Sequence, residues 1–261
     1  MATCIFSDMK LFDSHCHLQV PELSPAIGKV MARAAKAGVE RMVCCSTSSG
    51  DWQKVLQLAG EYPQIFPMIG IHPWFVSDGW SGEFQTLGKL LRENSGAGIG
   101  ETGLDSQKRF ANRAEQEACF SAHLDLAREL TRPVAVHCVH AWGRLIEILR
   151  EHPTPRVLLH AFGGAVELIP ELIALNCWFS FCGSVTHPNA RRVRAAAFAV
   201  PEDRLLIETD SPDFTPPDCQ QPNEPANLVQ VVRAIANLRG ISFESLAGLT
   251  FNNTERFFAS V

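Results

Sequence analysis

Short apolar runs alternate with longer amphipathic stretches along nearly the whole chain. The short runs are typical of strands buried on both faces, and we predict eight of them, at 10–15, 39–46, 65–72, 97–101, 133–138, 156–160, 177–181 and 203–209. Helical periodicity predicts helices between and after them, at 22–37, 51–61, 83–93, 112–130, 141–151, 165–175, 188–199, 223–238 and 242–259. Ser242 is the expected N-cap of the last helix. Such strict alternation predicts parallel strands joined by right-handed crossovers.

Eight strand and helix units close most simply into a (β/α)₈ barrel, the TIM-barrel fold. The alternative is an open doubly wound sheet, which commonly carries a glycine-rich phosphate loop after its first strand. Here the first strand runs instead into the sequence DSHCH at 13–17. No linker or shift in composition divides the chain, so we predict one domain over residues 1–261.

The composition narrows the class of protein. With 46% hydrophobic and 20% charged residues, the 261-residue chain is neither disordered nor a repeat protein. It has no apolar run long enough for a membrane span and no signal-peptide pattern at its start. Nearly all of its nine cysteines lie in apolar surroundings, as reduced thiols do. We therefore expect a soluble, cytoplasmic protein.

The charge gives little support for nucleic-acid binding. A net charge of −5 provides no overall basic surface for a polyanion. The richest basic stretch contains Arg191, Arg192 and Arg194. This pattern is typical of a solvated helix face, and a phosphate-contacting patch is the alternative.

Histidines and acids gather where the predicted strands end. They are His15, His17, His72, Glu101, His137, His160 and Asp210. In a barrel, all these strand ends meet at one mouth, where such folds assemble their active sites. His15 and His17 are two residues apart and share one face of their strand. Buried polar groups without partners are costly, and a divalent cation removes that cost.

Imidazole and carboxylate ligands without clustered thiolates suit Zn²⁺, Mn²⁺, Co²⁺, Mg²⁺ or Ni²⁺ rather than a cysteine-rich structural zinc. Six ligands suit two ions better than one. Glu101 can bridge two ions that activate a water, and Asp210 can both bind and accept the water's proton, which is the chemistry of hydrolysis.

Two other kinds of nucleophile are poorly supported. Ser184, Thr209 and Ser211 lack the G-x-S-x-G pattern of a serine hydrolase. Cys138 follows His137 directly, so on a strand the two side chains face opposite ways and do not act as a pair.

The motifs, taken together, resemble those of a known family. They are DSHCHL at 13–18, GIHPW at 70–74, GETGLD at 100–105, HAFGG at 160–164, ETDSP at 208–212 and QPNEP at 221–225. In this order they resemble the TatD family of metal-dependent hydrolases over nearly the whole chain. The resemblance implies a barrel of the amidohydrolase type, a divalent metal centre and cytoplasmic deoxyribonuclease or 3′–5′ exonuclease activity. It implies as metal ligands His15, His17, Glu101, His137, His160 and Asp210, and it implies that His72 contacts the substrate phosphate.

The chain also departs from the family's usual pattern. Val139 and His140 follow Cys138 where many members have an arginine. Ser106 and Gln107 replace a frequent aromatic pair, and Asp213 replaces another aromatic residue, as in a less characterised branch of the family. These changes remove contacts to phosphates and bases.

Three functions are therefore weighed. The leading one is a metal-dependent phosphodiesterase acting on single-stranded DNA ends, as a monomer without an obligate protein partner. The second is hydrolysis of a small ester, lactone or amide, and the third is a non-catalytic barrel that binds metal or a protein. The aromatic residues Trp74, Phe75 and Trp80 either form a stacking lip for substrate or pack a loop onto the rim.

Overall fold

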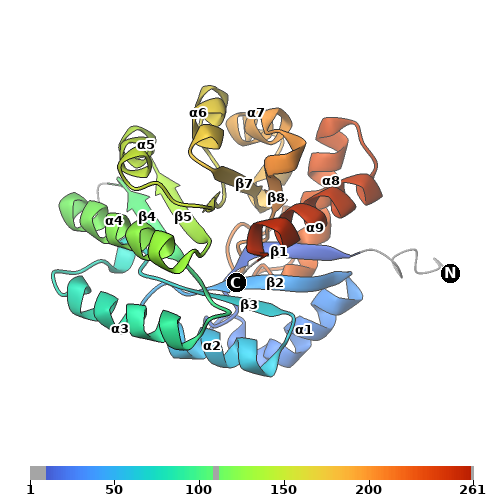
Figure 1. Cartoon of the computed structure of the whole chain (residues 1–261). Coiled ribbons are helices and arrows are strands. Elements are labelled where there is room, and N and C mark those ends of the chain that lie inside the picture. Colours follow the sequence, from blue (N-terminus) through green and yellow to red (C-terminus); the bar gives the residue numbers. More distant parts are fainter. Residues whose placement is uncertain (1–9, 108–111, 260–261) are drawn as a thin grey trace.

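The computed structural model describes residues 10–107 and 112–259, and within them eight parallel strands form one sheet in sequential order (Figure 1). The strands are β1 (Leu11–Cys16), β2 (Val39–Cys45), β3 (Ile65–Ile69), β4 (Gly98–Asp105), β5 (Val134–Val139), β6 (Val157–Leu159), β7 (Cys177–Phe181) and β8 (Leu205–Ile207). The first and last strands meet: Asp210 N–H donates to the His15 carbonyl (3.0 Å), and His17 N–H donates to the Ser211 carbonyl (2.8 Å). The predicted barrel is confirmed. A doubly wound sheet would reverse its strand order at a switch point, and the sequential order found here excludes it.

The helices lie around the outside of the strands (Figure 1). They are α1 (Ile27–Lys36), α2 (Trp52–Glu61), α3 (Trp80–Glu93), α4 (Arg113–Leu130), α5 (Trp142–Glu151), α6 (Ile169–Ala174), α7 (Arg191–Ala199), α8 (Leu228–Arg239) and α9 (Phe243–Phe258). The predicted cap of α9 is present, since Ser242 Oγ accepts the Ser245 N–H at 3.0 Å. In the described part of the chain, no helix has the length and apolar character needed to span a membrane.

Apolar side chains fill the barrel up to its polar mouth. They are Phe12, Val43, Cys45, Met68, Ala135, Leu158, Trp178 and Leu206 from the strands, with Phe257 and Phe258 from α9. Helix α9 therefore covers the end of the barrel where the strands begin, and Arg156 fastens it by donating to the Phe257 carbonyl (2.7 Å). Within the described residues, the opposite end, where the strands finish, is not filled by apolar side chains and carries the polar residues. The eight cysteines of the described residues are all free thiols.

Two predicted strand ends are wrong. β3 ends at Ile69, so His72 lies in the loop beyond it, and β4 continues to Asp105, so Glu101 lies in the middle of its strand. The segment after Glu101 looks polar and glycine-rich, yet it pairs with β5. Gly103 has φ +134°, and a Cβ there would lie 2.0 Å from the His137 carbonyl oxygen. Glycine is thus required for close approach of the two strands, and is not the sign of a loop.

The basic stretch on α7 is a helix face. Arg191 and Arg192 are exposed, and Arg194 donates to the Val185 carbonyl (2.9 Å). None of the three lines the pocket described below.

Candidate metal centre

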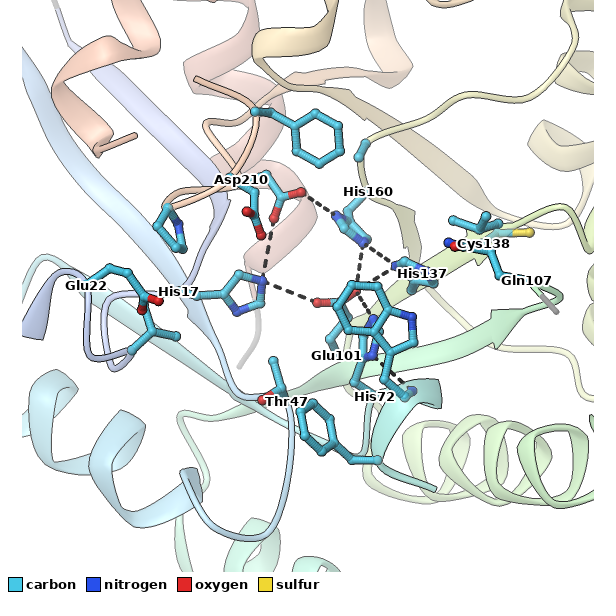
Figure 2. Close-up of a pocket in the computed structure, with 18 residues that line it drawn as sticks. His17, Glu22, Thr47, His72, Glu101, Gln107, His137, Cys138, His160 and Asp210 are labelled. Carbon is cyan, nitrogen blue, oxygen red and sulfur yellow. Dashed lines mark hydrogen bonds and ion pairs between the residues drawn. The ribbon is translucent and has the colours of Figure 1, made fainter. Parts of the chain in front are cut away.

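Six predicted ligands converge at the mouth of the barrel. We call them the donor set: His15, His17, Glu101, His137, His160 and Asp210. They come from five different strands or the residues just after them, and their side chains are at most 12% exposed. Figure 2 shows the Glu101 carboxylate at the centre, with His17, His137 and His160 pointing toward it.

The two oxygens of Glu101 face two different groups of imidazoles. Oε1 lies 2.7 Å from His160 Nε2 and 3.2 Å from His137 Nδ1. Oε2 lies 3.3 Å from His15 Nε2 and 3.4 Å from His17 Nε2. Glu101 therefore stands between two clusters of nitrogen donors, as a bridging carboxylate does.

Asp210 joins the group around Oε2. Its Oδ1 lies 3.6 Å from His15 Nε2 and 3.5 Å from His17 Nε2. The residue has a left-handed φ of 53°, which aspartate tolerates better than most residues. Its backbone bond to His15, which helps to close the barrel, holds it in this conformation.

Each imidazole of the donor set has its other ring nitrogen beside a protein atom. The pairs are His15 Nδ1 with Cys45 Sγ (3.3 Å), His17 Nδ1 with the Cys45 carbonyl (2.8 Å), His137 Nε2 with Asp105 Oδ2 (3.3 Å) and His160 Nδ1 with Glu208 Oε1 (3.6 Å). The acceptors beside His17 and His137 orient these two rings and fix their tautomers, whereas His160 Nδ1 lies beyond hydrogen-bond distance of Glu208.

These tautomers test whether a cation fits the donor set. The Cys45 carbonyl can only accept, so His17 Nδ1 carries the ring proton and Nε2 presents a lone pair. By the same reasoning, the Asp105 carboxylate leaves His137 Nδ1 as a lone pair that faces Glu101 Oε1 at 3.2 Å. A lone pair and a carboxylate oxygen repel at this distance unless a proton or a cation lies between them. The donor set therefore fits divalent metal.

The electrostatics lead to the same conclusion. Burial lowers the pKa of His17, but the Asp210 and Glu101 carboxylates outweigh it and raise the pKa to about 9. Burial raises the pKa of Asp210, but His17 and the other imidazoles outweigh it and lower the pKa to about 2. Without a cation, the centre thus draws protons onto His17, His137 and His160 and keeps its carboxylates ionised, whereas burial and the neighbouring His160 lower the pKa of His15.

His72 differs from the donor set in its tautomer. Its Nδ1 accepts the backbone N–H of Trp74 (3.2 Å), so its Nε2 carries the proton and donates to Glu101 Oε1 (3.2 Å). Burial lowers its pKa to about 4, which keeps the ring neutral. His72 lines the pocket and accordingly gives an N–H, bonded to Glu101, rather than a lone pair. The predicted contact with a substrate oxygen would have to take over this N–H.

A second buried histidine, His123, holds the loop that carries His72. His123 on α4 lies with Nδ1 2.7 Å from the Cys119 carbonyl, so its Nε2 accepts the backbone N–H of Ile71 (3.2 Å). The residue is completely buried, and burial lowers its pKa to about 4. His123 thus holds the loop that carries His72 as a neutral hydrogen-bonding group.

The donor set, except for His15, lines the floor of a pocket of about 540 Å³. Trp74, Phe75 and Phe214 line it with rings that are 44%, 49% and 48% exposed. The carboxylates of Glu22 and Asp213 also line it, and within the described residues no lysine or arginine does. Trp74 and Phe75 therefore lie where substrate would enter.

Trp80 and Cys138 have different surroundings. Trp80 packs against Phe84 with ring centroids 5.9 Å apart and is not among the pocket residues. Of Trp74, Phe75 and Trp80, only Trp80 does not line the pocket and packs against the protein instead. Cys138 borders the pocket, but burial raises the pKa of its thiol and so disfavours a thiolate nucleophile.

Sequence reasoning missed the acceptors behind the imidazoles. Asp105 and Glu208 both lie in recognised motifs, GETGLD and ETDSP, but only one carboxylate of each motif was given a role. Asp105 could have been found as the residue that ends β4, had the strand been predicted to its full length. The Cys45 carbonyl had no signal in the sequence, because a backbone acceptor depends on register alone.

Comparisons with known proteins identify the family of this chain. The sequence profile of the family "TatD related DNase" matches residues 12–259. The chain is 35% identical over 256 residues to the uncharacterized metal-dependent hydrolase YcfH of Escherichia coli K12, covering 96% of each protein. It is 32% identical over 256 residues to the 3′-5′ ssDNA/RNA exonuclease TatD of Klebsiella pneumoniae, covering 95% of this chain and 97% of that protein.

A solved structure gives the same result for the fold. The crystal structure of YjjV, a TatD homologue from E. coli, superposes with a TM-score of 0.91 at 28% identity, covering 95% of this chain and 97% of that one. Sequence, fold and convergent donor set lead to one assignment: the chain belongs to the TatD family of metal-dependent hydrolases.

Proposed function

We propose that this protein is a divalent-metal-dependent phosphodiesterase that removes nucleotides from the 3′ end of single-stranded DNA. The observation that carries the proposal is the position of Glu101, whose two oxygens separate two clusters of imidazoles at the floor of an open pocket. Residues arranged in this way could hold two cations, which would supply positive charge for in-line displacement at phosphorus. The exposed rings of Trp74 and Phe75 support the nucleic-acid substrate, since aromatic rings stack on bases of any sequence.

The donor set would hold two cations. Glu101 Oε1, His137 and His160 form one position, and Glu101 Oε2, His15, His17 and Asp210 form the other. Imidazole and carboxylate donors accommodate Zn²⁺, Mn²⁺, Mg²⁺, Co²⁺ or Ni²⁺. When bound, the cations supply positive charge that lowers the pKa of a water and offsets the charge developing on phosphoryl oxygens.

The protein's own groups then have separate roles. Asp210 is ionised at neutral pH and borders the pocket, so it can accept the proton of the attacking water. The neutral His72 has one N–H, on Nε2, which donates to Glu101 Oε1 in this structure. Transferred to a phosphoryl oxygen, this donor would stabilise the negative charge that develops there in the transition state. The burial of the donor set keeps bulk water from screening these charges.

The experiment uses a 5′-labelled single-stranded oligonucleotide and protein reloaded with each cation after chelation. We expect products shortened stepwise from the 3′ end, with release of mononucleotides. Glu101→Ala should abolish cleavage while its circular dichroism spectrum stays that of the wild type. Internal cuts only, or cleavage that survives in Glu101→Ala, would refute the proposal.

A second function is favoured by one observation, the acidic rim. Glu22 and Asp213 border the pocket and repel a polyanion, whereas a small neutral ester, lactone or amide is indifferent to them. A panel of such substrates, assayed beside the oligonucleotide, distinguishes the two functions. Turnover of a panel member that depends on Glu101, without cleavage of DNA, would favour the small-molecule hydrolase.

A further inference from the structure

Asp105 holds three parts of the pocket wall and is itself completely buried. Its Oδ2 accepts the indole N–H of Trp74 at 2.7 Å and lies 3.3 Å from His137 Nε2. Its Oδ1 accepts the backbone N–H of Gln107 at 2.9 Å. All three partners line the pocket, whereas Asp105 does not.

The bond to the indole explains how an exposed ring is fixed. Trp74 is 44% exposed, yet its ring packs edge-on against His72, with centroids 4.8 Å apart, and against His137, with centroids 6.0 Å apart. A hydrogen bond to a carboxylate is stronger than one to a neutral acceptor. The indole is therefore held directly beside the metal centre.

The same carboxylate sets the tautomer of His137. The two oxygens of Asp105 receive N–H groups from Trp74, Gln107 and His137, as a carboxylate that acts only as an acceptor does. His137 therefore keeps its proton on Nε2 and turns its Nδ1 lone pair toward Glu101. One oxygen, Oδ2, thus serves the pocket wall and the metal centre at once.

We propose that Asp105 is a positioning residue that couples the Trp74 ring, as a platform for an aromatic or heterocyclic part of the substrate, to the cation held through His137. The inference rests on the proposed role of His137 as a ligand. A substrate that presses on the indole changes the hydrogen bond that Asp105 accepts from His137. By linkage, cation binding at His137 and substrate binding at Trp74 then change each other's affinity by the same factor.

An asparagine at position 105 would break this arrangement. Its amide has one acceptor oxygen of lower charge and an NH₂ group that would face the donors of Trp74, Gln107 or His137. Because the indole and the imidazole share Oδ2, Asp105→Asn either leaves both on a weaker acceptor, with its NH₂ against the Gln107 N–H, or loses both. Trp74→Phe is the complementary change, because it keeps a ring but removes the N–H that Asp105 accepts.

The first arm measures cation binding with Co²⁺ alone, by chelator competition and visible absorption. Asp105→Asn should weaken one of the two bound ions by about 10–100-fold, the range seen when the carboxylate behind a ligating imidazole is changed. The matched control is Asp125→Asn on the exposed face of α4, which should bind Co²⁺ as the wild type does. Wild-type affinity for both ions in Asp105→Asn would overturn the proposal.

The second arm separates KM from kcat on bis(p-nitrophenyl) phosphate. Trp74→Phe should raise KM more than it lowers kcat, and the double variant should show a KM effect smaller than the product of the single effects, because both changes break one contact. A KM effect of the double variant equal to the product of the two single effects would refute the proposed coupling. Should Asp105→Asn not fold, the Co²⁺ spectrum of Trp74→Phe decides, since a band shift supports the proposal and an unchanged spectrum refutes it.

The two proposals fail in different ways. If the wild type binds Co²⁺ but cleaves no phosphodiester, the proposed substrate is wrong, and the Co²⁺ arm alone decides the role of Asp105. If the wild type cleaves DNA and Asp105→Asn matches it in Co²⁺ binding and in KM, only the role of Asp105 is wrong.

Discussion

The buried His123 should make the stability of this protein fall steeply below neutral pH. Its Nε2 accepts the Ile71 N–H and its Nδ1 donates to the Cys119 carbonyl, so a second proton would place two N–H groups against each other. Burial lowers its pKa to about 4, against 6.5 for an ordinary histidine. Because the folded pKa is the lower one, the unfolded chain binds more protons between these values, and the free energy of unfolding decreases as pH falls from about 6.5 to about 4.

The size of the effect follows from the shift. One pKa unit corresponds to about 1.4 kcal/mol, so the full shift of His123 corresponds to about 3 kcal/mol, of which about 2 kcal/mol is lost between pH 7 and pH 5. His123→Gln removes the titration but keeps an acceptor for Ile71. The variant is expected to be less stable at pH 7, since it loses ring packing against Phe84, but to lose about 2 kcal/mol less than the wild type on acidification.

Urea unfolding followed by circular dichroism, with chelator present, measures how the free energy of unfolding changes with pH in the wild type and in His123→Gln. Other buried groups titrate equally in the two proteins and cancel in the comparison. His187→Gln is the matched control, because it is the same substitution at an exposed histidine. If wild type and His123→Gln lose stability in parallel from pH 7 to pH 5, the reasoning about His123 is refuted.

Three further predictions concern the centre, the strands and the pocket rim. Because the pKa of His17 is raised to about 9, cation binding at pH 7 should release a proton, and affinity should increase with pH up to about 9; a titration in weak buffer without proton release would contradict this. Gly103→Ala should destabilise the fold by about 3 kcal/mol or more, because its Cβ would collide with β5, whereas Gly143→Ala on α5, where a Cβ meets nothing within 4 Å, should unfold like the wild type in the same thermal scan. Glu22→Gln combined with Asp213→Asn should lower KM for an oligonucleotide a few-fold at low salt, with the difference shrinking as salt is added; a KM that ignores both changes would show that the rim does not face the substrate.

The barrel and the donor set could be predicted from sequence because both depend on side-chain pattern. Apolar runs mark buried strands, and polar residues at their ends stand out against the apolar background. β4 shows where this reasoning fails. Its second half is polar and rich in glycine, and it is a strand only because Gly100 and Gly103, with φ +136° and +134°, allow close approach to β5. Pairing with β5 determines the length of β4, and the local pattern of polar and apolar residues does not predict this pairing.

The atoms that accept hydrogen bonds from the imidazoles could not be predicted from sequence, for a related reason. His17 is oriented by a backbone carbonyl of β2, and His137 by a carboxylate four residues beyond Glu101 on β4. Which atom faces a ring nitrogen depends on the register of neighbouring strands and on local bulges, such as the shift in the β4 and β5 pairing after Ile99. A composition of histidines and acids predicts a cation, but only coordinates show which nitrogen is available to it.

Closure of the barrel and binding of a cation are linked through the same residues. The backbone bonds that join β1 to the end of β8 belong to His15, His17, Asp210 and Ser211, and three of these residues are in the donor set. A cation at these side chains therefore stabilises the join between the first and last strands. A ligand that binds only the folded state adds about 2.7 kcal/mol at one hundred times its Kd.

Mn²⁺ or Zn²⁺ should accordingly raise the free energy of unfolding in proportion to the logarithm of its concentration above Kd. Asp210→Asn should reduce this increase while leaving the stability in chelator close to that of the wild type, because asparagine accepts the left-handed φ of 53° and keeps the backbone bond to His15. Equal stabilisation of both proteins by the cation would show that Asp210 is not a ligand. A large loss of stability in chelator would show instead that its carboxylate, rather than its backbone, closes the barrel.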